Sequence, residues 1–320
     1  MSSFGVRWRR LGRAAPAFLV LAAIAGCGSA TTHTSTTTSS RTSTAASQPA
    51  ATVKSSNGVP IPADPARIVS LSPSATEDLY AVGAGPQVVA VDQYSTYPTD
   101  APRTSLTAYE PNAEAIAKYR PDLVVTYEDV DHIVEELGKL HIPVLLDLPP
   151  AALSGAYHEV MELGAVTGHA QRGAAVAAAM RRQVAAIVAS VPKPRRPLSV
   201  YHELDQTYYS ASSGSFIGQL YTLLGLRNIA DKAAKGSQYP QLSSEYVIAS
   251  NPDLIVLADT VCCGQSAKTV AARPGWKDIA AVRDHAVLAV NDSVASEWGP
   301  RIVLFLQTIA DEVRRLEATR

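Results

Sequence analysis

Three cysteines carry the most distinctive chemistry available to this 320-residue chain. Cys27 stands alone near the N-terminus, whereas Cys262 and Cys263 are neighbours followed by Gly264. Adjacent cysteines cannot join distant segments, so the chain is not a disulfide scaffold. Neither a C-x-x-C pair nor a histidine cluster near them gives the spacing of a zinc site. The pair can form a vicinal disulfide or remain as thiols, and we favour a structural role in a tight turn.

Other residue types that carry catalysis lack the spacing that catalysis needs. The histidines form no H-x-x-x-H or H-x-H pair, and His202, at a predicted strand end, is the only one near a functional position. Gly83 and Gly85 follow a predicted helix and lack the third glycine of a dinucleotide-binding turn. A phosphate-binding P-loop and a G-x-S-x-G nucleophile elbow are also absent from the sequence. We therefore predict a protein that is not an enzyme, with no catalytic residue, metal site or cofactor.

Cys27 ends a segment with the features of an export signal. Four arginines between positions 7 and 13 precede an apolar run over residues 14–25, which is shorter than the roughly 20 residues that a membrane-spanning helix needs. The sequence Ile24-Ala25-Gly26-Cys27 is similar to a bacterial lipobox, in which the cysteine thiol receives a diacylglycerol and the chain is cut just before it. We predict a signal peptide over residues 1–26 and an exported protein, anchored by lipid on Cys27 to the outer face of the cell membrane. The alternative is an ordinary signal peptide with a chance cysteine.

The segment that follows is poor in bulky apolar side chains. Residues 27–60 consist largely of Ser, Thr and Ala, a composition that cannot bury enough surface to offset the entropy lost on folding. We predict a disordered stalk there. Residues 61–320 are enough for two lobes of ordinary size. The formal net charge of −1 gives no reason to expect nucleic acid as a partner.

Strand and helix patterns alternate along the rest of the chain. Strands are predicted at 67–71, 88–91, 122–126 and 144–146, and again at 198–202, 253–257 and 286–290; helices are predicted at 72–82, 114–119, 130–140, 154–167, 214–224 and from 300 to the C-terminus. A long alanine-rich run over residues 169–191 lies between the two series and is followed by three prolines, which end helices. The fold class is therefore α/β, with mostly parallel sheets. We expect two Rossmann-like lobes, at 61–168 and 193–320, joined by a long rigid α-helix at 169–192.

An internal repeat supports the similarity of the two lobes. Residues 114–125 match residues 245–256 in the position of a glutamate, a Pro-Asp-Leu sequence and an apolar strand. One copy stands on each side of the long helix. Glu114 and Glu245 begin the two copies.

Five motifs occur in a fixed order: Arg67-Ile-Val-Ser-Leu-Ser-Pro-Ser-Ala-Thr-Glu77, Tyr94-Ser-Thr-Tyr-Pro98, Arg120-Pro-Asp-Leu-Val124, Asn251-Pro-Asp-Leu-Ile255 and Trp298-Gly-Pro-Arg301. With these motifs, residues 66–320 resemble the helical-spine class of ABC-transporter substrate-binding proteins, which serve vitamin B12, haem and ferric siderophores. The likeness is greatest to the vitamin B12-binding proteins. It implies a monomer that captures its ligand in a cleft between two lobes and delivers it to a permease dimer with its ATPase.

The resemblance also implies which residues line the cleft. Aromatic side chains do so in the B12 binders, and the matching positions here are Tyr94, Tyr109, Tyr127, Tyr209 and Tyr239. A tyrosine offers a flat apolar body and a hydroxyl group, which suits a broad ring with a polar rim. The B12 binders carry tryptophan at several of these places, and tyrosine can ligate ferric iron. The ligand is therefore a corrinoid, a ferric siderophore or haem.

Six further residues have predicted roles in binding. Ser72 and Ser74 can donate to a polar ligand edge from a helix start, Asp292 can accept from a ligand amide, and Arg301 is the main basic candidate in the cleft. In the family, one glutamate on each lobe pairs with permease arginines, and Glu114 and Glu245 match those two positions. The alternative for each glutamate is that it only favours the dipole of its own helix.

Two other functions stay open at this point. One is an extracytoplasmic metal- or haem-binding enzyme on a similar two-lobed scaffold. The other is a sensory binding module that delivers nothing to a permease.

Overall fold

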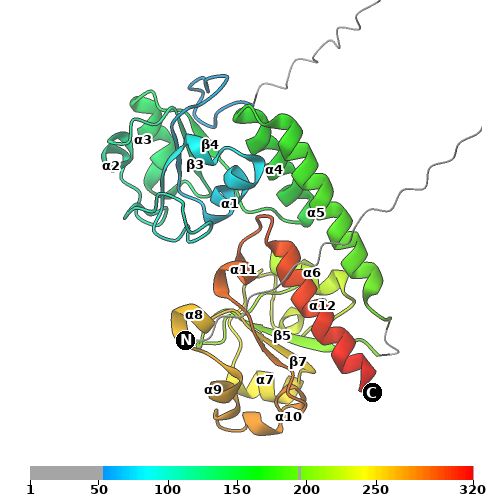
Figure 1. Ribbon diagram of the computed structural model, residues 1–320. Coiled ribbons are helices and arrows are strands. Elements are labelled where there is room, and N and C mark those ends of the chain that lie inside the picture. Colours follow the sequence, from blue (N-terminus) through cyan, green and yellow to red (C-terminus); the bar gives the residue numbers. More distant parts are fainter. Residues whose placement is uncertain (1–52, 194–195, 320) are drawn as a thin grey trace, which may run out of the picture. The chain divides into compact units, whose positions relative to one another are not determined.

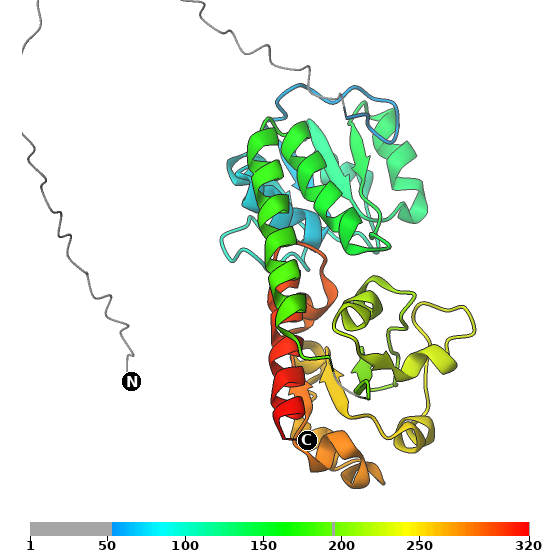
Figure 2. The same cartoon turned by 90° about the vertical axis from the view of Figure 1, so that its right-hand side faces the viewer.

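The structure is a computed structural model, which describes residues 53–193 and 196–319 (Figures 1 and 2). The predicted signal peptide, Cys27 and most of the predicted stalk lie outside these described residues. Within the described residues, no helix combines the length and apolar character that crossing a membrane would require.

The N-terminal lobe alternates strands and helices as the sequence predicts. Its elements are β1 (Ile68–Ser70), α1 (Pro73–Val82), β2 (Val88–Val91), α2 (Ala113–Ala117), β3 (Leu123–Thr126), α3 (Ile133–Lys139), β4 (Val144–Leu146) and α4 (Leu153–Val166), with 3-10 turns at Gly85–Gln87 and Val130–His132. The strands form one parallel sheet in the order β2-β1-β3-β4.

Both faces of this sheet are buried, as is usual for a parallel sheet with helices on both sides. Successive residues of β1 point to opposite faces: Ile68 packs with α1 and α4, and Val69 packs in a second cluster with α2 and α3. The ribbon shows the same layers, with α2 and α3 on one side of the sheet and α1 and α4 on the other (Figure 1). This explains why the strands are apolar at nearly every position.

The C-terminal lobe repeats the arrangement with more short helices. It contains β5 (Ser199–Glu203), α6 (Phe216–Leu223), β6 (Arg227–Asn228), α7 (Ser244–Ser250), β7 (Leu254–Leu257), α8 (Thr260–Cys263), α9 (Ala267–Ala271), α10 (Ala280–Arg283), β8 (Val287–Ala289), α11 (Asp292–Ser296) and α12 (Ile302–Ala318), with 3-10 turns at Ile229–Lys232 and Trp276–Asp278. The parallel strand order is β6-β5-β7-β8. It is the same order as in the first sheet, which confirms the predicted α/β class with two parallel sheets.

The aspartate of the internal repeat has one structural task in both lobes. Asp122 accepts hydrogen bonds from the backbone N–H of Arg67 and of Ala66, at 2.8 and 3.0 Å, just before β1. Asp253 accepts from the backbone N–H and the hydroxyl of Ser199, at 2.8 and 2.7 Å, at the start of β5. Each aspartate therefore ties the start of the first strand of its sheet to the third. The repeated Pro-Asp sequence reflects this requirement of the fold.

α5 (Ala170–Ser190) is the long helix predicted between the two sheets. It packs against α4 and α1 of the N-terminal lobe and against α12, which lies beside it in both views (Figures 1 and 2). α4 and α5 approach closely at Gly164 and Gly173, where a Cβ on Gly173 would lie 2.8 Å from the carbonyl oxygen of Val160. Only glycine permits this separation between the two backbones.

One predicted boundary, one helix and several short elements differ from the sequence-based expectation. The predicted stalk boundary at residue 60 is too late, because the N–H of Ser56 donates to the carbonyl of Val144 on β4 and the amide of Asn57 donates to the carbonyl of Ile142. The helix predicted at 130–140 is interrupted where Asp131 and His132 have positive φ. The short helices α8 to α11 were not predicted, because segments of four or five residues carry no periodic signal.

Replacement of Gly173 tests the contact between α4 and α5. Gly173→Val should lower the free energy of unfolding by about 1–3 kcal/mol, because the added side chain overpacks a closed interface. Urea unfolding followed by circular dichroism measures the change. The control is Ala174→Val, at an exposed position of the same helix, where only the weaker helix propensity of valine counts. Equal losses in the two variants would contradict the importance of this close approach.

Candidate ligand-binding cleft

A cavity of about 630 Å³ lies where the carboxyl ends of both sheets meet. Its lining includes Ser74 after β1, Tyr94 after β2 and Tyr127 after β3, all from the N-terminal lobe. From the C-terminal lobe it includes Cys262 after β7 and Asp292 after β8. Ligands of open α/β sheets bind outside the carboxyl ends of the strands. Both the position and the volume of this cavity therefore suit a small-molecule site.

One wall of the cavity is a continuous series of aromatic rings, with three tyrosines from the N-terminal lobe and one tryptophan from the C-terminal lobe. Tyr94 and Tyr109 meet edge to face with centroids 5.4 Å apart, Tyr109 and Tyr127 follow at 6.3 Å, and Tyr127 meets Trp298 at 6.4 Å. Edge-to-face contacts are a favourable arrangement of aromatic pairs. Tyr94 and Tyr109 are still 47% and 58% exposed, although aromatic side chains normally bury most of their surface. The series therefore presents apolar surface that a ligand could cover.

The predicted polar residues at this site are largely engaged within the protein. Ser72 is fully buried and caps α1 by accepting from the N–H of Ala75 at 3.2 Å. Ser74 lines the cavity, but its hydroxyl accepts from the N–H of Trp298 at 3.1 Å. Asp292 also lines the cavity, and its carboxylate accepts from the backbone N–H groups at the start of α8. Ser72 is therefore absent from the lining of the cavity, and Ser74 and Asp292 mainly fix its walls.

Arg301 lies elsewhere than predicted. It is absent from the lining of this cavity and instead lines a larger one of about 860 Å³ between the sides of α1, α5 and α12. Its guanidinium donates to the buried carboxylate of Glu77 at 2.6 Å and to Glu297 at 3.0 Å, and it lies over the Tyr97 ring, 4.1 Å from its centroid. Arg301 therefore joins the last helix of the chain to the first. The smaller cavity is the candidate ligand site, because the larger one faces no strand end.

Two carboxylates share the Arg301 guanidinium, and this perturbs the acid–base behaviour of the pair. Burial, the hydrogen bond with Glu77 and the charge of Glu77 together raise the pKa of Glu297 to about 9, against the opposing effect of Arg301. A site with one cation and two desolvated carboxyl groups is more stable when one of them holds a proton. Glu297 therefore holds its proton more strongly than a free glutamate, and both glutamates contact the one Arg301 guanidinium.

The remaining predicted residues lie outside the cavity lining. Tyr209 lies between β5 and α6 and is 41% exposed, whereas Tyr239 lies between the 3-10 turn Ile229–Lys232 and α7 and is 44% exposed. Partial burial of its ring raises the pKa of Tyr239. Glu114 and Glu245 are exposed in the first turns of α2 and α7. Hydrogen bonds from its own backbone N–H and from Ser243 lower the pKa of Glu245.

The structure adds cavity residues that sequence reasoning did not select. Trp298 closes the aromatic series, and Val261 and Cys262 also contribute to the lining of the cavity. Trp298 belongs to one of the five ordered motifs, and that position was the available signal. Val261 gave none, because its segment carries no periodicity. In the described residues, no group of three His, Cys, Asp or Glu side chains is placed to hold a metal ion.

Comparison with known proteins identifies the class to which this fold and site belong. The model of a family described as periplasmic binding protein matches residues 68–293. This chain belongs to that family of extracytoplasmic solute-binding proteins, whose members bind transported ligands and are not enzymes. The partners of such proteins are an ABC importer and a small-molecule ligand.

Individual relatives agree with this assignment. The chain is 33% identical to a cobalamin-binding protein of Halobacterium salinarum, over 78% of this chain and 69% of that one. It is 28% identical to the uncharacterized ABC transporter substrate-binding lipoprotein YvrC of Bacillus subtilis, over 81% and 83% of the two chains. The periplasmic heme-binding protein RhuT of Roseiflexus sp. superposes with a TM-score of 0.70 at 24% identity, covering 78% of this chain and 98% of the other. The structural likeness supports the fold.

The shared proton near Arg301 predicts a pH dependence of stability. A carboxyl group whose pKa is raised from about 4.3 in the unfolded chain to about 9 in the folded protein binds more protons when folded. Its contribution to stability is complete below about pH 4.3 and falls as the pH rises to about 9, by at most about 1.4 kcal/mol per pH unit. Burial also raises the pKa values of the Asp78 and Glu159 carboxyl groups. Their contributions to stability therefore also fall as the pH rises.

Glu297→Gln should therefore weaken the decline in stability between pH 5 and pH 9, leaving the share due to the other buried acids. Urea unfolding at several pH values measures the slope. Glu114→Gln, at an exposed position, is the control and should keep the wild-type slope. Identical slopes for wild type and Glu297→Gln would show that Glu297 takes up no proton on folding.

Proposed function

We propose that the protein captures a corrinoid of the vitamin B12 type in the 630 Å³ cavity and delivers it to an ABC importer. The observation that carries this proposal is the partly exposed aromatic series from Tyr94 to Trp298. A corrin ring is broad and apolar on its faces and polar on its rim, and tyrosine matches both properties. The Halobacterium relative is a cobalamin-binding protein, which supports the same ligand class.

Haem and ferric siderophores are the alternative ligands, because tyrosine can also ligate ferric iron. Burial of the ring, together with its hydrogen bond to Tyr109, raises the pKa of the Tyr127 hydroxyl. A hydroxyl group that keeps its proton can donate a hydrogen bond to the polar rim of a ligand. A corrinoid needs only packing and hydrogen bonds from this wall.

Titration of the full chain in detergent tests the ligand class. Cyanocobalamin, cobinamide, haemin and a ferric siderophore are added separately, and binding is followed by quenching of the intrinsic tyrosine and tryptophan fluorescence. We expect the lowest Kd for a corrinoid. Tyr109→Ala should raise that Kd about tenfold, since a lost ring contact of this kind is worth roughly 0.5–1.5 kcal/mol. Tyr109→Phe keeps the ring and is the matched control. A siderophore or haemin that binds tightly while every corrinoid binds weakly would refute the corrinoid assignment.

We further propose that Glu114 and Glu245 dock the protein onto the permease dimer. Both are exposed and stand at the same position of the internal repeat, one in each lobe. Two carboxylates in equivalent positions suit a two-fold partner with basic residues, and such charges fix orientation and speed association. Glu114 and Glu245 also stand in the first turns of their helices, where each favours its own helix dipole.

The double variant Glu114→Arg, Glu245→Arg separates docking from binding. Uptake of radiolabelled cyanocobalamin by cells should fall to background, while the Kd for cyanocobalamin stays at the wild-type value. The control carries the same change of charge at exposed acids elsewhere, Glu136→Arg with Asp278→Arg, and should transport normally. Transport by the first variant at the wild-type rate would instead favour a binding module that uses no such contact.

The membrane anchor is also part of the proposal. Cys27 lies outside the described residues, and the support comes from the basic start, the apolar run 14–25 and the lipobox-like sequence that ends at Cys27. The Bacillus relative is named a lipoprotein. A lipid on Cys27 and a stalk rich in serine and threonine would keep the binding domain near its permease at a high effective concentration.

A further inference from the structure

The pair Cys262–Cys263 forms a disulfide between neighbouring residues at the edge of the cavity. A disulfide stabilises a fold mainly by closing a loop in the unfolded chain, and the effect grows with loop length. A bond with a sequence separation of 1 closes no such loop. The disulfide therefore adds little to the stability of the fold, and its effect is on the local surface of the cavity.

That surface is apolar and exposed. Val261 is 70% exposed, and Cys262 and Cys263 are also exposed, although valine and cysteine are among the residues most often buried. Val261 and Cys262 line the cavity. Exposed apolar side chains that gather at one place mark a binding surface more often than chance packing. We call residues 261–263 the sulfur wall.

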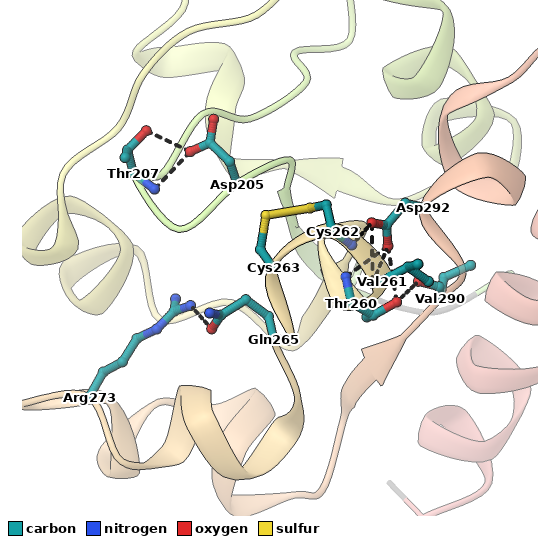
Figure 3. The surroundings of a disulfide bond; sticks show 10 residues. All are labelled: Asp205, Thr207, Thr260, Val261, Cys262, Cys263, Gln265, Arg273, Val290 and Asp292. Carbon is teal, nitrogen blue, oxygen red and sulfur yellow. Dashed lines mark hydrogen bonds between the residues drawn. A yellow bond between two sulfur atoms is a disulfide. The ribbon is translucent and has the colours of Figure 1, made fainter. Parts of the chain in front are cut away.

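The backbone N–H groups of Val261 and Cys262 already donate within the protein and are not available to a polar ligand. Asp292 accepts from the N–H of Thr260 at 2.7 Å, from that of Val261 at 3.0 Å and from that of Cys262 at 2.7 Å. The hydroxyl of Thr260 donates to the carbonyl of Val290 at 2.7 Å. Figure 3 shows these bonds converging on one side of α8, with the S–S bond outside this network. The wall is thus held rigidly by its backbone and meets the cavity with apolar side chains.

The same cavity has the aromatic series Tyr94, Tyr109, Tyr127 and Trp298 in its lining. Divalent sulfur is polarizable and packs favourably against conjugated rings. A flat conjugated ligand could therefore contact tyrosine rings from one lobe and the disulfide from the other. We propose that the Cys262–Cys263 disulfide is a ligand contact that selects conjugated macrocycles, rather than a structural crosslink. This inference rests on the proposed function.

Protection from reduction tests the contact directly. The full chain is exposed to tris(2-carboxyethyl)phosphine with and without cyanocobalamin, and free thiols are alkylated and counted by mass spectrometry. Trypsin releases both cysteines in one peptide, residues 236–268, which excludes Cys27. Ligand at about 100 times its Kd leaves about 1% of the sites open, so reduction should slow by at least about tenfold. Reduction at an unchanged rate in the saturated complex would overturn the inference and leave the proposed function intact.

Affinity gives a second measurement. Cys262→Ala with Cys263→Ala should raise the Kd for cyanocobalamin by about 2- to 13-fold, the range that corresponds to the loss of a sulfur–aromatic contact. Cys262→Ser with Cys263→Ser, which places polar groups on the same wall, should raise it at least as much. Lys268→Ala, on the exposed face of the next helix, is the control and should bind as the wild type does.

The outcomes separate the inference from the function on which it rests. Wild-type binding with equal affinity in both cysteine variants refutes the ligand contact alone. If haemin binds more tightly than any corrinoid, the same protection experiment with haemin decides the inference, and the corrinoid assignment falls. If the wild type binds none of the macrocycles, both proposals fall.

Discussion

The buried contact between residues 74–77 and residues 298–301 is the constraint on which the binding site depends. Arg301 pairs with Glu77, whose side chain is almost fully buried, and the N–H of Trp298 donates to Ser74. The close approach of Gly299 to the Glu77 carboxylate, where a Cβ would lie 2.9 Å from Oε2, leaves no room for a side chain. Removing one partner of a buried ion pair commonly costs about 3–5 kcal/mol, because the other charge stays desolvated. The first helix of the chain is thereby fixed against the last.

This contact places two chemically different walls around one cavity. Trp298 reaches the tyrosine series because its backbone is bonded to Ser74 at the start of α1. α11 and α12 pack on each other, so Asp292 and the α8 segment that it holds are positioned by the same part of the chain. The packing of α5 against α1 and α12 adds a second connection along the side of both lobes. A site assembled in this way can keep its shape when no ligand is present, which lowers the entropic cost of binding.

Several polar residues that the sequence analysis assigned to ligand binding have structural roles instead. Asp292 does lie in the cavity, but its carboxylate accepts hydrogen bonds from three backbone N–H groups of α8. Ser72 is a buried helix cap. Arg301 is a partner of buried acids, and it could not be assigned to them from the sequence because Glu77 lies 224 positions away. These polar side chains stabilise the protein around the cavity. The surfaces that remain for contact with a ligand are mainly apolar.

The sequence alone determined the fold class, the similarity of the two lobes implied by the repeat and the position of the long helix. These features follow from local periodicity, from prolines that end helices and from the Pro-Asp sequence that ties each third strand to the start of the first. The sequence also selected Tyr94, Tyr109 and Tyr127, which the fold gathers at the carboxyl ends of strands. Only the tertiary structure decided that Trp298 joins them, that Arg301 leaves the cleft and that Cys262 and Cys263 are bonded at its edge. Those outcomes depend on contacts between residues far apart in the chain and on the direction of single side chains, and neither is encoded in a local pattern.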